Sequence, residues 1–208
     1  MTTFACFHAR SQPLPQAGLT DIAKTSYGEG MPSPVGHALG GAIVSLVMAP
    51  NGPGAWSLGL GRNAFTLVAL AAVLPDIDFA WGRHNMETHS LGAAILAGLA
   101  VLAWTRGKNP SLALAVTLAW STHVLFDWLG SDDTPPLGVM ALWPLTSAFY
   151  FADAFVFEAI SRRYWLPNFI SHNAWAVIKE TLILGPPFLL LTALRWRGRR
   201  RFRRPGTR

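Results

Sequence analysis

Histidine and aspartate side chains in this chain lie at or near the ends of apolar segments, above all between Leu74 and Asp127. The motifs that carry them, in chain order, are Leu74-Pro75-Asp76-Ile77-Asp78, His84, Thr88-His89-Ser90 and His123-Val124-Leu125-Phe126-Asp127. His37 has a similar place upstream. Ionisable groups beside hydrocarbon are energetically expensive, so a set arranged in this way indicates a function. We interpret it as a metal site at one face of a helical membrane bundle.

The composition favours a membrane protein. Hydrophobic residues make up 51% of the 208 residues and charged residues 13%, whereas an ordinary soluble domain has roughly 25% charged residues. The mean hydropathy of +0.30 agrees with this reading. The length suits one domain, or a bundle of roughly four to six helices with short loops. We therefore predict an all-α fold, a multi-span transmembrane helical bundle.

Apolar runs and loops divide the chain into expected elements. Apolar runs cover about residues 35–49, 64–74, 89–104 and 111–129, and a loop follows at 130–146. An aromatic segment at 149–157 precedes a more polar stretch at 161–180, which we interpret as an interfacial helix. A last apolar run at 181–196 contains Pro186-Pro187.

The two ends of the chain differ from its body. Residues 1–30 contain Pro13, Pro15 and Gly18 without sustained periodicity, which predicts a flexible N-terminal extension. Translation from Met31, which would leave this stretch untranslated, is the alternative. Residues 31–196 form the predicted helical membrane domain, and residues 197–208 form a basic C-terminal tail.

Helix parity brings the candidate ligands together. Short connectors make consecutive helices antiparallel neighbours. The start of the first run, the end of the second, the start of the third and the end of the fourth then share one face. Those positions hold His37, Asp76 with Asp78, His89 with His84 nearby, and His123 with Asp127. All candidate ligands are therefore expected at one edge of the bundle.

The basic tail predicts the orientation. Eight of the 17 basic residues are arginines in the last fourteen positions. Positive residues favour the cytoplasmic side, so we predict a multi-pass protein of the bacterial inner membrane with a cytoplasmic C-terminal tail. The tail suits anchoring to anionic lipid headgroups of the bilayer. Nucleic-acid binding is not favoured, because only Trp196 and Phe202 interleave with the arginines and no nucleic-acid-binding motif accompanies them.

The residue types indicate the metal chemistry. Cys6 is the only cysteine, so imidazole and carboxylate must supply the ligands. His123 and Asp127 are four residues apart, which places them on one side of a helix at about 6 Å. The inventory of His and Asp exceeds the roughly four ligands of one tetrahedral zinc ion. Two divalent ions about 3.5–4 Å apart, bridged by a carboxylate, fit it better and would suit ester hydrolysis.

Each motif alone also has an ordinary explanation. A single His at a helix end is commonly an interfacial polar group, and Pro-Asp-x-Asp is a common turn. Two other functions use the same residues differently. A metal or proton transporter would place them as a pathway near mid-membrane. A non-enzymatic membrane regulatory protein would use the tail as its docking element.

The motif order over roughly residues 31–147 resembles the bacterial membrane-bound metal-dependent hydrolases, also described as LexA-binding, inner-membrane-associated hydrolases. The matching motifs include Pro34 with His37 and Gly40, Gly138-Val139 and Trp143-Pro144, besides those of the 74–127 stretch. The resemblance implies an integral membrane hydrolase with a divalent metal, and makes residues 31–196 a hydrolase-like domain. The Arg83-His84 order departs from the family pattern and leaves His84 in question as a ligand.

The resemblance implies the following ligand positions: His37, Asp76, Asp78, His89, His123 and Asp127. We predict Asp78 to act as bridging ligand or general base, and the loop with Asp132, Asp133 and Trp143-Pro144 to wall the substrate pocket. The ligand types and their order also resemble, more distantly, the zinc-dependent phospholipase C and single-strand nuclease group. This favours a phosphoester or phospholipid substrate and zinc as the metal.

Overall fold

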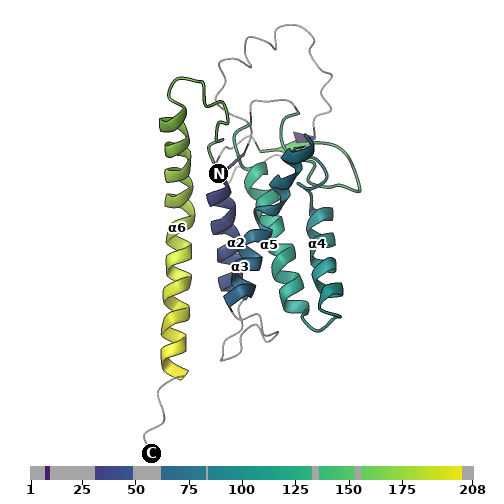
Figure 1. Cartoon of the computed structure of the whole chain (residues 1–208), viewed down its shortest axis with the longest axis vertical. Helices are drawn as coiled ribbons and strands as arrows, with labels where there is room; N and C mark the ends of the chain where they lie inside the picture. Colours follow the sequence, from purple (N-terminus) through teal and green to yellow (C-terminus); the bar gives the residue numbers. More distant parts are fainter. Residues whose placement is uncertain are drawn as a thin grey trace, which may run out of the picture.

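The computed structural model describes residues 8–9, 31–48, 62–82, 84–132, 136–152 and 156–202, with the side chains of all of these except residues 8–9, 62 and 199–202. This part of the chain is mostly helical (Figure 1). Its helices are α2 (Pro34–Met48), α3 (Arg62–Ala71), the 3-10 helix η1 (Leu74–Trp81), α4 (Leu91–Trp104), α5 (Pro110–Trp128) and α6 (Phe169–Phe202). Two short strands, β1 (His8–Ala9) and β2 (Tyr150–Phe151), pair in antiparallel fashion.

Helices α2 to α5 form a bundle in which α5 contacts α2, α3 and α4. Small side chains fill its centre, which lets the helix backbones approach closely. Gly98 of α4 faces Thr117 of α5, and a Cβ at Gly98 would collide with the Thr117 hydroxyl. We call the buried cluster between α3 and α5 the alanine core; it consists of Ala64, Val68, Ala71, Ala72, Leu112, Ala115, Val116 and Ala119.

Local signals in the sequence set the helix ends. The Ser90 hydroxyl accepts a hydrogen bond from Ala93 N at 3.0 Å and caps α4, as such residues do at helix N-termini. Asn109 caps α5 in the same way, and Pro110 follows at the first helical position. Helix α3 ends at Ala71, four residues before Pro75, because a proline ring clashes with the carbonyl four positions earlier.

Helix α6 differs from the prediction. We expected an interfacial helix at 161–180 and a separate apolar segment at 181–196, but one helix runs from Phe169 to Phe202 with Pro186 and Pro187 inside it. It also continues past residue 197, where we placed the start of the tail. Prolines are tolerated inside membrane helices because local adjustments satisfy the freed backbone groups. Helix α6 lies beside α2 (Figure 1), and the Arg195 guanidinium donates to Val47 O at 2.9 Å.

The other predicted runs correspond to helices with ends shifted by a few residues. The described residues add the two-stranded β1–β2 pair, in which His8 faces Phe151, to the predicted all-α fold. The rest of the predicted N-terminal extension, Asp133 and the last six residues of the tail lie outside the described residues.

By length and composition, one helix of the described chain, Phe169–Gly198, is long and apolar enough to cross a membrane. The helix pair Asn63–Ala71 and Leu74–Trp81, bent by 50°, would be a second span if the pair crosses as one. Two shorter helices, Pro34–Met48 and Leu91–Trp104, are also apolar.

Candidate metal centre

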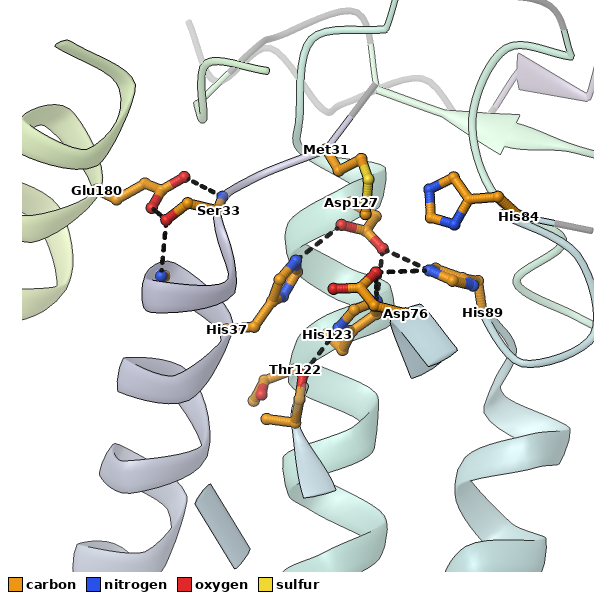
Figure 2. A network of polar contacts seen from close by, with 12 residues as sticks. Met31, Ser33, His37, Asp76, His84, His89, Thr122, His123, Asp127 and Glu180 are labelled. Atoms are coloured by element: carbon orange, nitrogen blue, oxygen red, sulfur yellow. Dashed lines mark hydrogen bonds and ion pairs between the residues drawn. The ribbon is translucent and has the colours of Figure 1, made fainter. Parts of the chain in front are cut away.

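Five side chains from four separate parts of the chain meet at one end of the helix bundle (Figure 2). We call this group the metal centre; its members are His37 of α2, Asp76 of η1, His89 just before α4, and His123 and Asp127 of α5. Helix parity predicted this meeting, because the start of α2, the start of η1 after the second apolar run, the start of α4 and the end of α5 share that end of the bundle. All but Asp76 are fully or almost fully buried.

Asp127 lies in the middle of the group (Figure 2). Its Oδ1 is 3.2 Å from Nε2 of His37. Its Oδ2 is 2.9 Å from Nε2 of His123 and 3.4 Å from Nε2 of His89. One carboxylate therefore faces the same ring nitrogen of all three histidines.

Asp76 approaches the same nitrogens from η1. Its Oδ1 is 3.5 Å from Nε2 of His89 and 3.6 Å from Nε2 of His123. The side chain is 15% exposed, whereas those of the histidines and Asp127 are 0% exposed. Asp76 is thus the one member of the metal centre whose side chain is partly exposed to solvent.

The atoms that face one another are short of hydrogen bonds. Within the described chain, no hydrogen-bond partner is found for Nε2 of His37, His89 and His123, for Oδ1 of Asp76, or for either carboxylate oxygen of Asp127. Unpaired buried polar atoms are costly and uncommon in native proteins. Imidazole nitrogens and carboxylate oxygens are the donors that zinc and similar ions take, so the residues present fit a divalent cation.

The Nδ1 atoms of His89 and His123 contact groups outside the metal centre. Nδ1 of His89 is 3.0 Å from Oδ2 of Asp78, which also accepts a hydrogen bond from the Thr88 hydroxyl at 2.6 Å. Nδ1 of His123 donates to the carbonyl of Ala72 at 2.8 Å. Such hydrogen bonds fix the tautomer and the orientation of a ligating imidazole, so Nε2 is the nitrogen that remains for an ion.

For Asp78, the predicted part of bridging ligand or general base stays a prediction. Its carboxylate contacts Nδ1 of His89 and, at 3.0 Å, Nδ1 of His84, so it lies behind His89. It is fully buried, and its oxygens have partners within the protein. The side chains of Asp78, His84 and His89 are also close enough to one another to hold an ion. Nδ1 of His89, however, cannot donate to Asp78 and bind an ion at the same time.

His84 is the second histidine that Asp78 contacts. Its ring packs on Phe79 with ring centroids 3.8 Å apart, and its Nε2 is buried without a hydrogen-bond partner in the described chain. Burial lowers the pKa of His84 below its usual value, against the raising effect of Asp78. Burial would lower the pKa of His89 as well, but the carboxylates of Asp76 and Asp78 outweigh it and raise that pKa to about 9. The carboxylates around His89 thus favour positive charge.

Residues 31–201 match the YdjM inner membrane protein family. The chain belongs to this family. It is accordingly a bacterial inner membrane protein associated with the lipid bilayer, as the sequence predicted. Comparison with curated proteins and with solved structures gives no match.

Several residues that the sequence singled out lie apart from the metal centre. Asp132 accepts a hydrogen bond from Gly138 N at 2.6 Å within its own loop. The carbonyl of Trp143 accepts from Gly92 N at 3.2 Å, so this loop packs on the N-terminus of α4. His172 of α6 also lies elsewhere, and its Nε2 donates to the carbonyl of Ala159 at 2.8 Å.

The sequence reasoning missed two residues of the family-matched region that adjoin the metal centre. Glu180 of α6 is fully buried and contacts Ser33, which precedes α2 (Figure 2). The available signal was an acidic residue directly before the apolar run 181–196. We assigned Glu180 to an interfacial helix, because the sequence does not show which helix covers it.

Proposed function

We propose that this protein is a membrane-bound, metal-dependent hydrolase. The observation that carries the proposal is the set of buried nitrogen and oxygen atoms at the metal centre, from three histidines and two aspartates, that face one another without hydrogen-bond partners in the described chain. A site of this kind is costly to build, so it is expected where an ion satisfies it.

The ligands of the proposed ion are Nε2 of the three histidines with carboxylate oxygens of Asp127 and Asp76. Two overlapping groups, His37–His123–Asp127 and Asp76–His89–His123, have donor atoms within 4.8 Å of one another. Both groups use His123, whose Nε2 has one lone pair. One ion, rather than the two expected from the residue inventory, is therefore the simpler occupant, and zinc suits the nitrogen-rich set.

A bound divalent ion would supply Lewis acidity and lower the pKa of a coordinated water towards neutrality. Residues of the chain would bind the ion and transfer the proton of that water. Asp78 fixes His89 and His84, and its contact to Nδ1 of His84 leaves Nε2 of His84 as a proton acceptor. We therefore assign proton transfer to His84, and to Asp78 the positioning of both rings.

Arg162 supports an anionic substrate such as a phosphoester, including that of a phospholipid. Its guanidinium carbon lies 3.1 Å from the centroid of the Phe79 ring, and its Nη2 lies 3.1 Å from Sδ of Met31. The Phe79 ring in turn stacks on His84, with ring centroids 3.8 Å apart. The donors of a guanidinium match the geometry of phosphate oxygens, so we expect Arg162 to bind the phosphate group of a substrate at the metal centre.

We further propose that α2 to α5 cross the membrane together with α6. Large apolar side chains cover the outside of α4, with Leu91, Ile95, Leu96, Leu99 and Trp104 each more than 40% exposed. Polar and charged residues instead lie inside, as expected when lipid surrounds a bundle. Arg62, Arg106, Lys108 and Arg195 lie at the end opposite the metal centre. Because basic residues favour the cytoplasmic side, we propose that this end and the tail lie in the cytoplasm.

The test is metal analysis of the full-length protein purified in detergent, with a screen of phosphodiester and carboxylic ester substrates. We expect stoichiometric zinc or another divalent ion, hydrolysis of a phosphodiester, and loss of both in His123→Ala. Loss of metal with normal membrane insertion in that variant is the expected pattern. A wild-type protein that binds no divalent ion would refute the proposal.

The position of the ligands argues against a transporter. His37 lies in the first turn of α2, His89 lies before α4, and Asp127 lies in the last turn of α5. A transport pathway needs such groups near the middle of the spans, whereas these lie at one end. Cation-dependent flux in reconstituted vesicles, with no hydrolysis, would reverse this conclusion.

A further inference from the structure

Glu180 is an acidic side chain in the middle of α6, a helix whose other large side chains mostly point outward. Leu182, Leu189 and Leu190 are each more than 60% exposed, whereas Glu180 is 0% exposed. Burying a carboxylate in a helix of this kind is expensive and marks a functional position. The contacts of Glu180 indicate that function.

The Glu180 carboxylate holds the start of α2 (Figure 2). Oε1 accepts a hydrogen bond from Ser33 N at 2.6 Å, and Oε2 accepts one from the Ser33 hydroxyl. The hydroxyl oxygen of Ser33 in turn accepts from Gly36 N at 3.2 Å, and Ser33 O accepts from His37 N at 3.2 Å. Glu180 is therefore connected to the backbone of His37 through a single residue.

Gly36 is shaped to this contact. A Cβ added at Gly36 would lie 2.7 Å from Oε2 of Glu180 and 2.9 Å from its Cδ. Residue 36 must consequently lack a side chain for the carboxylate to reach Ser33. This close approach shows that the Glu180 carboxylate directly contacts the first turn of α2.

The three histidines of the metal centre are held in different ways. Asp78 and the carbonyl of Ala72 hold Nδ1 of His89 and His123. No hydrogen-bond partner for Nδ1 of His37 is found within the described residues. The orientation of His37 accordingly depends more on its backbone turn, which is the turn that Glu180 and Ser33 fix.

We propose that Glu180 is a positioning residue of the metal centre, which couples helix α6 to His37. It fixes the α2 turn that presents His37, and its negative charge lies near the N-terminus of α2, where a helix favours anions. The same charge favours the divalent cation that the five facing ligands would hold. This inference rests on the metal centre of the proposed function.

The experiment is titration of the detergent-purified full-length apoprotein with Co²⁺, with the visible absorption of the bound ion as a spectroscopic signature. Glu180→Gln removes the charge at nearly constant shape, and Gly36→Ala displaces the carboxylate while retaining it. We expect both variants to bind Co²⁺ roughly tenfold or more weakly, in the range seen when hydrogen-bond partners of ligands are altered. The cobalt spectrum should also change, because His37 moves relative to the other ligands.

Leu184→Ala is the matched control. Leu184 lies one turn further along α6, is buried, and belongs to the apolar cluster that includes Phe126 and Phe157. We expect Leu184→Ala to lower the melting temperature and to leave the Co²⁺ affinity and spectrum unchanged. Unchanged affinity and spectrum in Glu180→Gln would overturn the inference, as would equal weakening in Leu184→Ala. A wild-type protein without stoichiometric Co²⁺ would instead refute the metal centre itself.

Discussion

The two ends of the α3–α5 helix pair differ in the chemistry of their buried side chains. At one end, the alanine core packs side chains of one to four carbons, and all of its members are buried. At the other, α5 carries His123 and Asp127, whose buried Nε2, Oδ1 and Oδ2 atoms find no hydrogen-bond partner in the described chain. The same helix thus supports a tightly packed apolar contact and a costly polar one within 19 residues.

This difference distinguishes the residues that pack the helices together from those that we propose to bind an ion. The alanine core has what helix association in a membrane requires, namely small residues and close backbones. The metal centre has no such explanation, because buried unpaired polar groups weaken a fold. Its polar atoms contact one another at ion-pair distances, and imidazole with carboxylate is the donor set that the proposed divalent ion would use.

The largest expected effect is loss of the metal from the polar end alone. Asp127→Asn removes the charge that faces all three histidines, so we expect metal content close to zero, measured by elemental analysis of purified protein. The alanine core should keep the variant folded and inserted in the membrane.

Ser45→Ala serves as the control for Asp127→Asn, because Ser45 is a buried polar residue near the other end of α2. Its metal content should equal that of the wild type. Full metal content in Asp127→Asn would show that the polar end does not hold the ion.

A smaller effect is expected from Asp78→Asn, because Asp78 contacts His89 and His84 from behind the facing nitrogens. Affinity for zinc should fall by roughly 10- to 100-fold, while one equivalent still binds at saturation. A competition titration with a chelating dye measures both quantities.

Asp132→Asn is the matched change in a carboxylate of the loop after α5, which accepts a hydrogen bond from Gly138 N. It should leave zinc affinity unchanged. If Asp78→Asn instead lost the metal completely, Asp78 would be a direct ligand, as the sequence first indicated.

The smallest effect concerns the packed part of the bundle. Gly98→Val would collide with Thr117 and approach the carbonyl of Ala113, so the free energy of unfolding should fall by about 1–3 kcal/mol. Thermal unfolding in detergent, followed by circular dichroism, measures the change.

Metal stoichiometry should survive in Gly98→Val, in contrast to Asp127→Asn. The neighbouring Leu99→Ala is the control, since Leu99 is 53% exposed and would face lipid. Loss of metal in Gly98→Val at temperatures where the protein remains folded would contradict the separation of the two ends.

Much of the fold followed from local patterns. The four apolar runs, the cap at Ser90 and the break before Pro75 define helices that the structure reproduces within a few residues. Helix α6 was divided in the prediction because Lys179 and Glu180 made the stretch up to residue 180 more polar than the run that follows it. In the structure Glu180 is buried against Ser33, so a charged residue at this point does not end the helix.

The candidate site was also predictable in outline, since parity alone brings His37, His89 and His123 to one end of the bundle. Helix parity shows at which end of the bundle a residue lies but not which way its side chain points, so it could not distinguish the position of Asp76 from that of Asp78. These residues are two apart on the 3-10 helix η1, and one faces Nε2 of His89 while the other faces Nδ1. That distinction depends on how η1 is turned by its contacts.

The sequence by itself determined the helical class, the inner membrane setting and the end of the bundle where the ionisable residues gather, because these depend on hydrophobicity, chain direction and segment length. The tertiary structure alone decided which atoms face one another, that Asp78 lies behind His89, and that Glu180 of α6 secures the turn of His37. Such assignments depend on ring orientation and helix rotation, which are set by packing between segments far apart in the chain.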